Sequence, residues 1–214
     1  MFDLLLAGGP FMFATLGISI GAVAIILQRL YTLWVKYRLP GPAYLKQVLD
    51  LSESGSYPQA LQLCSMNRHP LMRILKSALV RADRSEKDIR RAVEAQAAVE
   101  LPTIRALTAY LPHLANLATL CGLLGTIHGL IVSFQGIGNT ESTAARQAML
   151  AKGIAIAFYN TFFGLAVAVG TVFAYMIISG RQSRILTAME QATTRLVDHL
   201  ASQRTGAQRR GATA

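Results

Sequence analysis

Two glycine-rich apolar segments decide the fold: Gly122-Leu-Leu-Gly-Thr-Ile-His-Gly129 and Gly153-Ile-Ala-Ile-Ala-Phe-Tyr-Asn-Thr-Phe-Phe-Gly-Leu165. Each lies inside a long apolar stretch, and a short polar hairpin, residues 136–143, joins the two stretches. Glycine clusters let helices approach closely in lipid, and hydroxyl groups in a dry interior bond to a helix or line a water path. We therefore expect two packed membrane helices in which Thr126 and Thr161 are the polar groups of most interest.

Working outward, the charged residues define three membrane spans. The chain has 214 residues, of which 52% are hydrophobic and 15% are charged, and Asp, Glu, Lys and Arg are absent from 4–28, 106–140 and 153–180. A helix needs about 20 mostly apolar residues to cross the hydrocarbon core. These windows predict an all-α membrane protein with three transmembrane helices. A soluble bundle with buried helices is the alternative, and three windows of this length count against it.

The division of the chain follows from these windows. We expect a first span within 1–33, a cytoplasmic helical segment over 34–105, a second span within 106–136 and a short periplasmic hairpin over 137–150. A third span within 151–181 and a cytoplasmic helical tail over 182–214 complete the chain, and the end of the tail, 204–214, is expected to be disordered.

The net charge of +10 is a signal of membrane orientation and does not indicate nucleic-acid binding. Residues 29–105 hold 13 Lys/Arg and 7 Asp/Glu, and residues 181–214 hold 6 and 2. Lys and Arg collect on the cytoplasmic side of membrane proteins, so we expect the amino terminus outside and the carboxyl terminus inside. Basic residues near the end of the tail are expected to contact anionic lipids: Arg204, Arg209 and Arg210.

The cytoplasmic segment is expected to form short amphipathic helices near 43–52, 58–66 and 70–82. Ser85, followed by two acidic residues, predicts the start of a longer helix that runs on into the second span. Two prolines are expected to kink that helix: Pro102 and Pro112. The tail carries apolar residues on one side of a helix: Ile185, Met189, Ala192, Leu196 and Leu200.

Polar side chains recur on one face of each glycine-rich span. In the second span they are seven residues apart: Thr119, Thr126 and Ser133. In the third span, a stripe of small or hydroxyl-bearing residues contains Thr161, and Asn160 lies beside it. Two interpretations stay open, tight packing with hydroxyls bonded to the preceding turn, or the lining of an ion pathway. The candidate pathway-lining residues are Thr126, Thr161, Asn160, Thr119 and Ser133. Five glycines are assigned to helix packing: Gly122, Gly125, Gly129, Gly153 and Gly164.

Titratable groups are scarce in the predicted spans. His113 and His128 are better explained as neutral residues bonded to a neighbouring helix than as proton carriers, since neither span holds an acid. If protons move, the carboxylate has to come from another chain. The sequence offers no nucleophile–base set, phosphate-binding loop or metal-ligand spacing, so we expect a protein that is not an enzyme and needs no cofactor or metal.

The paired motif resembles the TolQ/ExbB/MotA family of proton-driven motor subunits. The resemblance rests on the first segment with Ser133-Phe134, and on Gly153-Ile-Ala-x-Ala followed by Thr161-x-x-Gly164-Leu165, in the same order and spacing. Pro70-Leu-Met-Arg-Ile-Leu75 fits more weakly, and the resemblance covers about 11–184. Three spans and a modest cytoplasmic segment are closer to the TolQ/ExbB branch than to the four-span MotA branch.

The resemblance implies a homopentamer in the bacterial inner membrane, around a dimer of single-span TolR/ExbD/MotB-like partners. The partner's membrane Asp carries the proton, and the two family threonines that face it map onto Thr126 and Thr161. The resemblance also implies that proton flow rotates the pentamer and drives transport, envelope maintenance or gliding. A TonB/TolA-like force-transmitting protein is a further partner that the resemblance allows, alongside membrane lipids.

Three positions depart from the family pattern. TolQ and ExbB usually carry a Glu where this chain has Ile156, and an aromatic where it has His128. The stretch before Thr161, Phe158-Tyr159-Asn160, is bulkier and more polar than usual. A gliding or other specialised motor therefore fits as well as a TonB- or Tol-system subunit.

A second hypothesis of a different class is a non-conducting membrane scaffold for an envelope complex. A stand-alone transporter is a poorer fit, because one chain has neither a titratable path nor an internal repeat. A neighbouring gene for a small single-span protein with an Asp in its span would favour the motor.

Overall fold

The computed structural model describes residues 9–37, 42–66, 69–138 and 142–212, and all regular structure in these ranges is helical. The expected all-α class is confirmed. The chain divides into two compact units. We call Met1–Leu30 with Leu107–Ser179 the apolar unit, and Tyr31–Ala106 with Gly180–Ala214 the polar unit.

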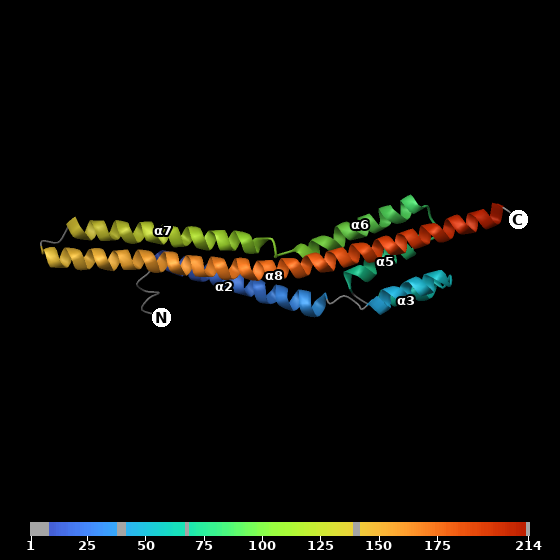
Figure 1. The fold of residues 1–214 in the computed structure, drawn as a ribbon, viewed down its shortest axis with the longest axis horizontal. Coiled ribbons are helices and arrows are strands. Elements are labelled where there is room, and N and C mark those ends of the chain that lie inside the picture. The colour runs from blue at the N-terminus through green and yellow to red at the C-terminus, as the bar shows by residue number, and fades with distance from the viewer. Residues whose placement is uncertain (1–8, 38–41, 67–68, 139–141, 213–214) are drawn as a thin grey trace. The chain divides into compact units, whose positions relative to one another are not determined.

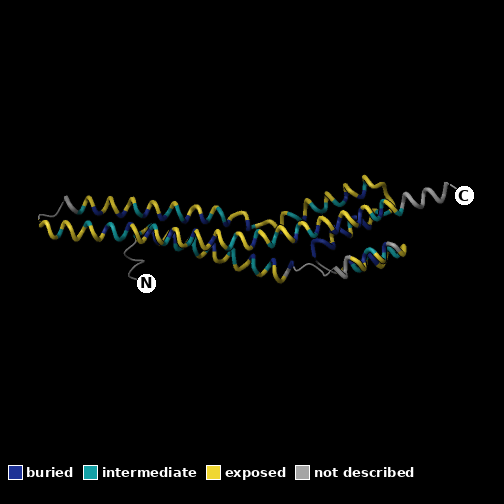
Figure 2. Tube along the Cα trace, viewed as in Figure 1, coloured by how far each residue is buried: buried dark blue, intermediate teal, exposed yellow. Residues whose placement is uncertain are grey.

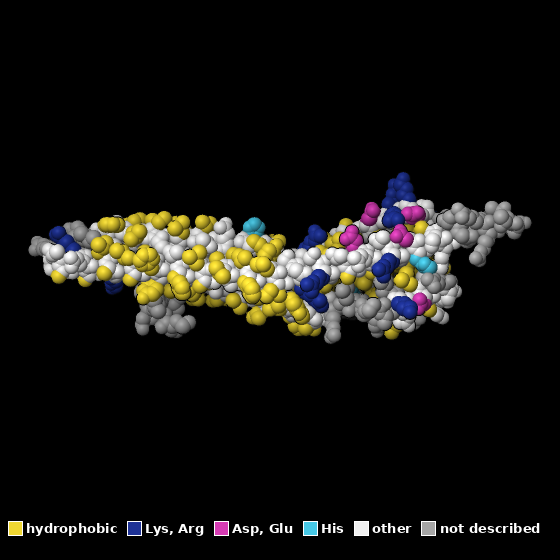
Figure 3. All heavy atoms as spheres, viewed as in Figure 1, with side chains coloured by type: hydrophobic (Ala, Val, Ile, Leu, Met, Phe, Trp, Pro, Cys, Tyr) yellow, Lys and Arg dark blue, Asp and Glu magenta, His cyan; other side chains and the backbone are white. Residues whose placement is uncertain are grey.

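The apolar unit consists of α2 (Pro10–Tyr31), α7 (Tyr110–Gly138) and the first part of α8 (Thr143–Ala212) (Figure 1). All three helices are long and apolar enough to cross a membrane. Large apolar side chains are exposed along each of them, and they cover much of the face of this unit seen in Figure 3. So much exposed apolar surface would be a liability in water and is what lipid requires. The chain is therefore a membrane protein.

Helix α2 packs through one face. Pro10 is its first residue, where the N–H that proline lacks has no partner in the helix. Its buried residues recur at spacings of three and seven, which places them on one side: Met12, Thr15, Ala22 and Arg29. The ring of Phe11 lies against the ring of His128 on α7, with centroids 5.6 Å apart. This side of α2 therefore carries its contacts with the rest of the unit.

The sequence predicted one helix, kinked at Pro102 and Pro112, that runs from Ser85 into the second span, but the structure has two separate helices there. Helix α6 (Glu86–Arg105) contains Pro102 in its last turn and ends before Ala106. Leu107 has a φ of 61°, in the left-handed region that side chains other than glycine rarely adopt. A residue in this conformation interrupts the helical hydrogen-bond ladder, and α7 begins afresh at Tyr110.

Helix α8 is longer at both ends than the sequence predicted. It starts at Thr143, so most of the expected hairpin after 142 is helical, and it continues to Ala212, through the tail end that was expected to be disordered. Residues 143–152 are rich in strong helix formers, and extending an existing helix costs far less than nucleating one. The tip of the expected hairpin, 139–141, lies outside the described residues.

The polar unit contains η1 (Thr32–Lys36), α3 (Pro42–Glu53), α4 (Tyr57–Met66), α5 (Pro70–Leu79), α6 and the second part of α8. The predicted start of α6 is confirmed, since the Asp88 N–H donates to the Ser85 hydroxyl at 3.2 Å. The predicted apolar side of α8 is also confirmed, because all five of its residues are buried: Ile185, Met189, Ala192, Leu196 and Leu200. Figure 2 shows buried and exposed residues alternating along this part of the chain.

Polar contacts join α8 to the other helices of the polar unit. The Tyr57 hydroxyl donates to Gln203 Oε1 at 3.2 Å, and Gln203 Nε2 donates to the Ser52 carbonyl at 3.4 Å. Arg90 of α6 pairs with Asp198 at 3.0 Å. Together with the apolar stripe, these contacts make α8 the element that α3, α4 and α6 share.

Candidate functional site

The interface between α7 and α8 is built on glycine. A Cβ added at Gly122 would lie 3.2 Å from the Cα of Gly164, and one at Gly164 would lie 2.9 Å from the Cα of Gly122. A Cβ at Gly129 would lie 3.2 Å from the backbone nitrogen of Ala157. The two backbones are thus in direct contact, which dispersion and packing favour in lipid, where burial of apolar surface gains nothing.

Two polar side chains fill places that glycine leaves empty. A Cβ added at Gly125 of α7 would lie 2.6 Å from Cγ of Asn160 on α8, and Asn160 is 2% exposed. In the opposite direction, a Cβ added at Gly153 of α8 would coincide with the hydroxyl of Ser133 on α7. Each helix therefore inserts one polar side chain against a glycine of the other.

The hydroxyls of both helices donate to their own backbone. Thr119 bonds to the Ala115 carbonyl at 3.1 Å and Ser133 to the Gly129 carbonyl at 2.9 Å. Thr126 donates to the carbonyl of Leu123 at 2.6 Å, and Thr161 to that of Ala157 at 3.4 Å. Each hydroxyl oxygen keeps lone pairs for a second partner, so these bonds are compatible with packing and with a water path.

The predicted polar residues fall into two groups by exposure. Thr119, Thr126 and Thr161 are half-buried, while Ser133 and Asn160 are buried between α7 and α8. Spacing by seven placed Ser133 with the threonines but could not separate a face turned to a neighbouring helix from a face left open. The antiparallel order of the two segments was visible in the sequence, but the register that brings Gly125 opposite Asn160 and Ser133 opposite Gly153 was not.

His128 is an exposed residue of α7 that contacts α2. Besides the ring of Phe11, a Cβ added at Gly9 would lie 4.0 Å from His128 Cε1. His128 is two residues from Thr126 on α7 and so points to a different side of that helix. A cavity of about 320 Å³ next to it is lined by Ser133, Lys152 and Ile156 among others. His113 is exposed on α7.

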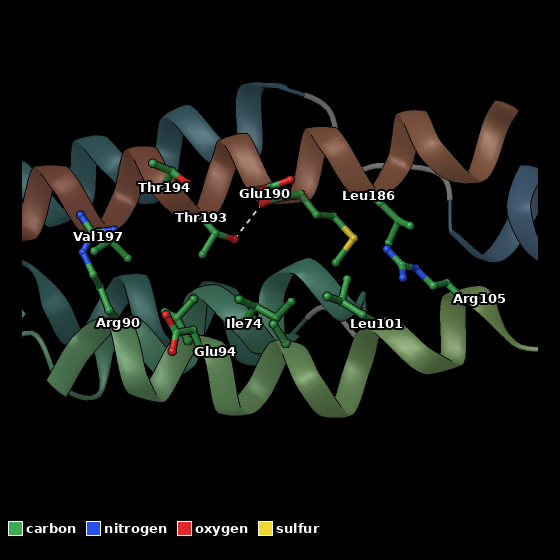
Figure 4. Close-up of a pocket in the computed structure, with 13 residues that line it drawn as sticks. Ile74, Arg90, Glu94, Leu101, Arg105, Leu186, Glu190, Thr193, Thr194 and Val197 are labelled. Atoms are coloured by element: carbon green, nitrogen blue, oxygen red, sulfur yellow. Dashed lines mark hydrogen bonds between the residues drawn. The ribbon is translucent and has the colours of Figure 1, made fainter. Parts of the chain in front are cut away.

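The polar unit has a groove of about 450 Å³ between α6 and α8. Its lining is mostly apolar and includes Ile74, Leu101 and Leu186, with Arg90 and Arg105 toward opposite ends (Figure 4). Arg90 is already paired with Glu86 at 2.9 Å and with Asp198. No cluster of three His, Cys, Asp or Glu side chains suited to a metal ion occurs among the residues that the structure describes.

Comparison with known proteins identifies relatives over most of the chain. The model of the MotA/TolQ/ExbB proton channel family matches residues 66–191. A putative biopolymer transport protein, ExbB-like 3, of Synechocystis sp. is 33% identical over 78% of this chain and 79% of its own length. An ExbB homolog of Methanothermobacter thermautotrophicus is 27% identical over 82% of this chain and 61% of its own. The structure of C. jejuni MotAB superposes with a TM-score of 0.62 at 16% identity, covering 94% of this chain and 78% of that one, which supports the shared fold.

Proposed function

Since the chain belongs to the MotA/TolQ/ExbB proton channel family, we propose that it is a subunit of a motor driven by the proton-motive force in the bacterial inner membrane. In this proposal several copies surround a single-span partner of the ExbD or MotB kind. Proton flow through the complex is converted into mechanical work for transport, envelope maintenance or gliding. The family is associated with channels and transport, which fits a protein that is not an enzyme.

The observation that carries the proposal is the pair of threonines on adjoining helices. Thr126 follows Gly125 and Thr161 follows Asn160, and Gly125 and Asn160 are in contact. Both threonines are half-buried, so their hydroxyls are within reach of a group outside this chain. Thr119 extends the same side of α7. We assign these three hydroxyls to the pathway wall, with Ser133 and Asn160 behind it.

The partner has to supply the titrating group. Helix α7 contains no formally charged residue. Before Arg181, α8 contains two, Arg146 and Lys152, and both lie near its amino-terminal end. A carboxylate from a second chain would supply the charge that moves between bulk water and the threonines. The distribution of Lys and Arg supports an amino terminus outside and a cytoplasmic polar unit.

The test is proton-driven activity of the chain reconstituted with its single-span partner in liposomes. Thr161→Val keeps the shape and removes the hydroxyl, so a proton flux that depends on this group should fall at least about tenfold. Assembly should persist, because an intramembrane hydrogen bond contributes about 0.6 kcal/mol on average. Thr161→Ser restores the hydroxyl and should retain most of the flux.

The competing scaffold function has one observation in its favour: Thr126 and Thr161 donate to carbonyls of their own helices. A scaffold predicts normal assembly for Thr161→Val with no measurable flux in the wild-type complex. Flux in the wild type together with full flux in Thr161→Val and loss in Thr161→Ser would instead make Thr161 a packing residue.

A further inference from the structure

We propose that Asn160 is a positioning residue that sets the register of α8 against α7, and thereby the relative heights of Thr126 and Thr161. The inference rests on the proposed function for its importance but on the interhelical contacts for its evidence. The side chain of Asn160 occupies the place of a missing side chain at Gly125, with Cγ, Cβ and Oδ1 at 2.6, 2.7 and 2.8 Å from an added Cβ. Its Nδ2 donates to the Ile156 carbonyl at 3.1 Å, which fixes the orientation of the amide.

The glycines of α7 would by themselves allow other registers. Gly122, Gly125 and Gly129 lie three and four residues apart on one face, so a slip by one helical turn, about 5.4 Å, would bring Asn160 opposite another glycine. The space that Gly125 leaves for Asn160 is therefore necessary for the observed register. It does not select that register, because the neighbouring glycines would leave similar spaces.

Ser133 and Gly153 supply the selection. In the observed register Ser133 occupies the open side of Gly153. A slip in one direction would bring Ser133 against Ala157, and a slip in the other would bring it against Met149, since these lie one turn away on the same helix. Both have a side chain where Gly153 has none. The two reciprocal contacts together therefore permit one register.

The register matters because each contact is next to a pathway threonine. Thr126 and Thr161 directly follow the residues of the Gly125–Asn160 contact. A slip by one turn would separate the two hydroxyls along the pathway by about 5.4 Å, more than the length of a hydrogen bond. Asn160 thus acts on the pathway through the helix, without its amide having to meet an ion or the partner.

Four variants, each expressed with the partner, test this inference. Gly125→Ala places a methyl group into the Asn160 amide and Asn160→Ala empties the seat, so each should lower proton-driven flux at least about fivefold. Because the Cβ of Asn160 itself lies 2.7 Å from an added Cβ at Gly125, the double variant Gly125→Ala/Asn160→Gly, which removes that Cβ, should recover at least half of the loss caused by Gly125→Ala. Asn160→Leu has a similar branched shape without polar atoms and should retain more flux than Asn160→Ala.

A spin-label distance provides a readout that does not depend on flux. Labels at Phe134 on α7 and Phe173 on α8, both exposed, report axial displacement of the helices in a background without Cys64 and Cys121. Gly125→Ala should shift this distance by up to about 5 Å, one helical turn, and the double variant should restore it. Gly180→Ala, on the same helix with no atom within 4 Å of an added Cβ, is the matched control and should leave the distance unchanged.

Three results would overturn the inference: an unchanged distance in Gly125→Ala, a double variant no better than the worse single variant, or Asn160→Leu with less flux than Asn160→Ala. The last result would place the amide itself in the pathway. A wild-type complex without flux would refute the proposed function and would leave the distance measurements to decide the register.

Discussion

Arg29, the last buried residue of α2, donates from Nε to the hydroxyl of Thr108 at 3.0 Å, immediately after the left-handed residue that separates α6 from α7. Arg29 is 3% exposed and Thr108 is 3% exposed, so the contact is shielded from water. A charged donor in such a place stabilises a break between two helices, where the backbone has lost its helical hydrogen bonds. The start of the second span is thus tied to the end of the first.

We expect Thr108→Val to lower the stability of the folded protein by about 1.5–3 kcal/mol, the range for hydrogen bonds to charged groups. Arg29→Lys should not substitute for arginine, because an ammonium group lacks the planar set of donors. Thermal unfolding in detergent measures both effects. Thr103→Val, which removes a partly buried hydroxyl bonded to the carbonyl of Glu100 at 2.7 Å, is the control and should cost less.

Cys64 should react slowly with thiol reagents. It is 2% exposed, and burial raises the pKa of its thiol to about 11 from a usual value of 9.0. A rise of two units leaves about a hundredfold less thiolate near neutral pH. Maleimide labelling should therefore be at least that much slower for Cys64 than for a cysteine at Met66, which is 79% exposed. Equal rates would contradict the burial of Cys64.

Because Cys64 is buried, its thiol is unsuitable for determining membrane orientation by labelling. In a background of Cys64→Ser and Cys121→Ser, we expect Met66→Cys to be labelled from the cytoplasm and Ser142→Cys from the outside, since both positions are exposed. An impermeant reagent applied to cells and to inverted vesicles distinguishes the two sides. Labelling of both positions from one side would refute the orientation.

His69 should make the polar unit sensitive to acid. Its Nδ1 accepts the Leu71 N–H at 3.1 Å as the N-cap of α5, and burial lowers its pKa below the usual 6.5. The unfolded chain binds a proton at His69 more readily than the folded chain does. The free energy of unfolding should therefore decrease as pH falls through about 6.5 and below. His69→Asn keeps a cap without a titrating group and should flatten the profile between pH 7 and 5. An unchanged profile would exclude His69 as its source.

We also expect the chain to purify as an oligomer. Gly17 and Gly21 on α2 and Gly170 on α8 have no atom within 4 Å of an added Cβ in this chain. Glycine weakens a helix by about 1 kcal/mol relative to alanine, and contact between copies would offset that cost. Native mass spectrometry in mild detergent measures the number of copies. A monomer as the only species would rule out a multi-copy pathway.

The sequence predicted those parts of the molecule that depend on local pattern. Three charge-free windows correspond to α2, α7 and the first part of α8, and the spacing of Ile185, Met189 and Leu196 identified the buried side of the tail. Ser85 marked a helix start because its hydroxyl and the acids after it act within one turn. These signals are strong because the interactions behind them join residues that are close in the sequence.

What the sequence missed depends on tertiary contacts. The left-handed conformation of Leu107 has no signature in its residue type, and its neighbour Thr108 is held by Arg29 from a distant segment. The burial of Asn160 and Ser133 depends on how α7 and α8 are aligned, and a periodic pattern on one helix carries no information about the register of a second. The assignment of a pathway to the threonines therefore remains a prediction.

The reciprocal seats between α7 and α8 also limit how the gene can change. A side chain gained at Gly125 or Gly153 meets an occupied place, so it is tolerated only after the opposite residue, Asn160 or Ser133, has become smaller. The two positions of each contact are thus expected to change together. The substitution to a smaller residue has to come first. Among descendants of this sequence, we expect the pairs 125/160 and 133/153 to co-vary, with glycine at both positions as the tolerated intermediate.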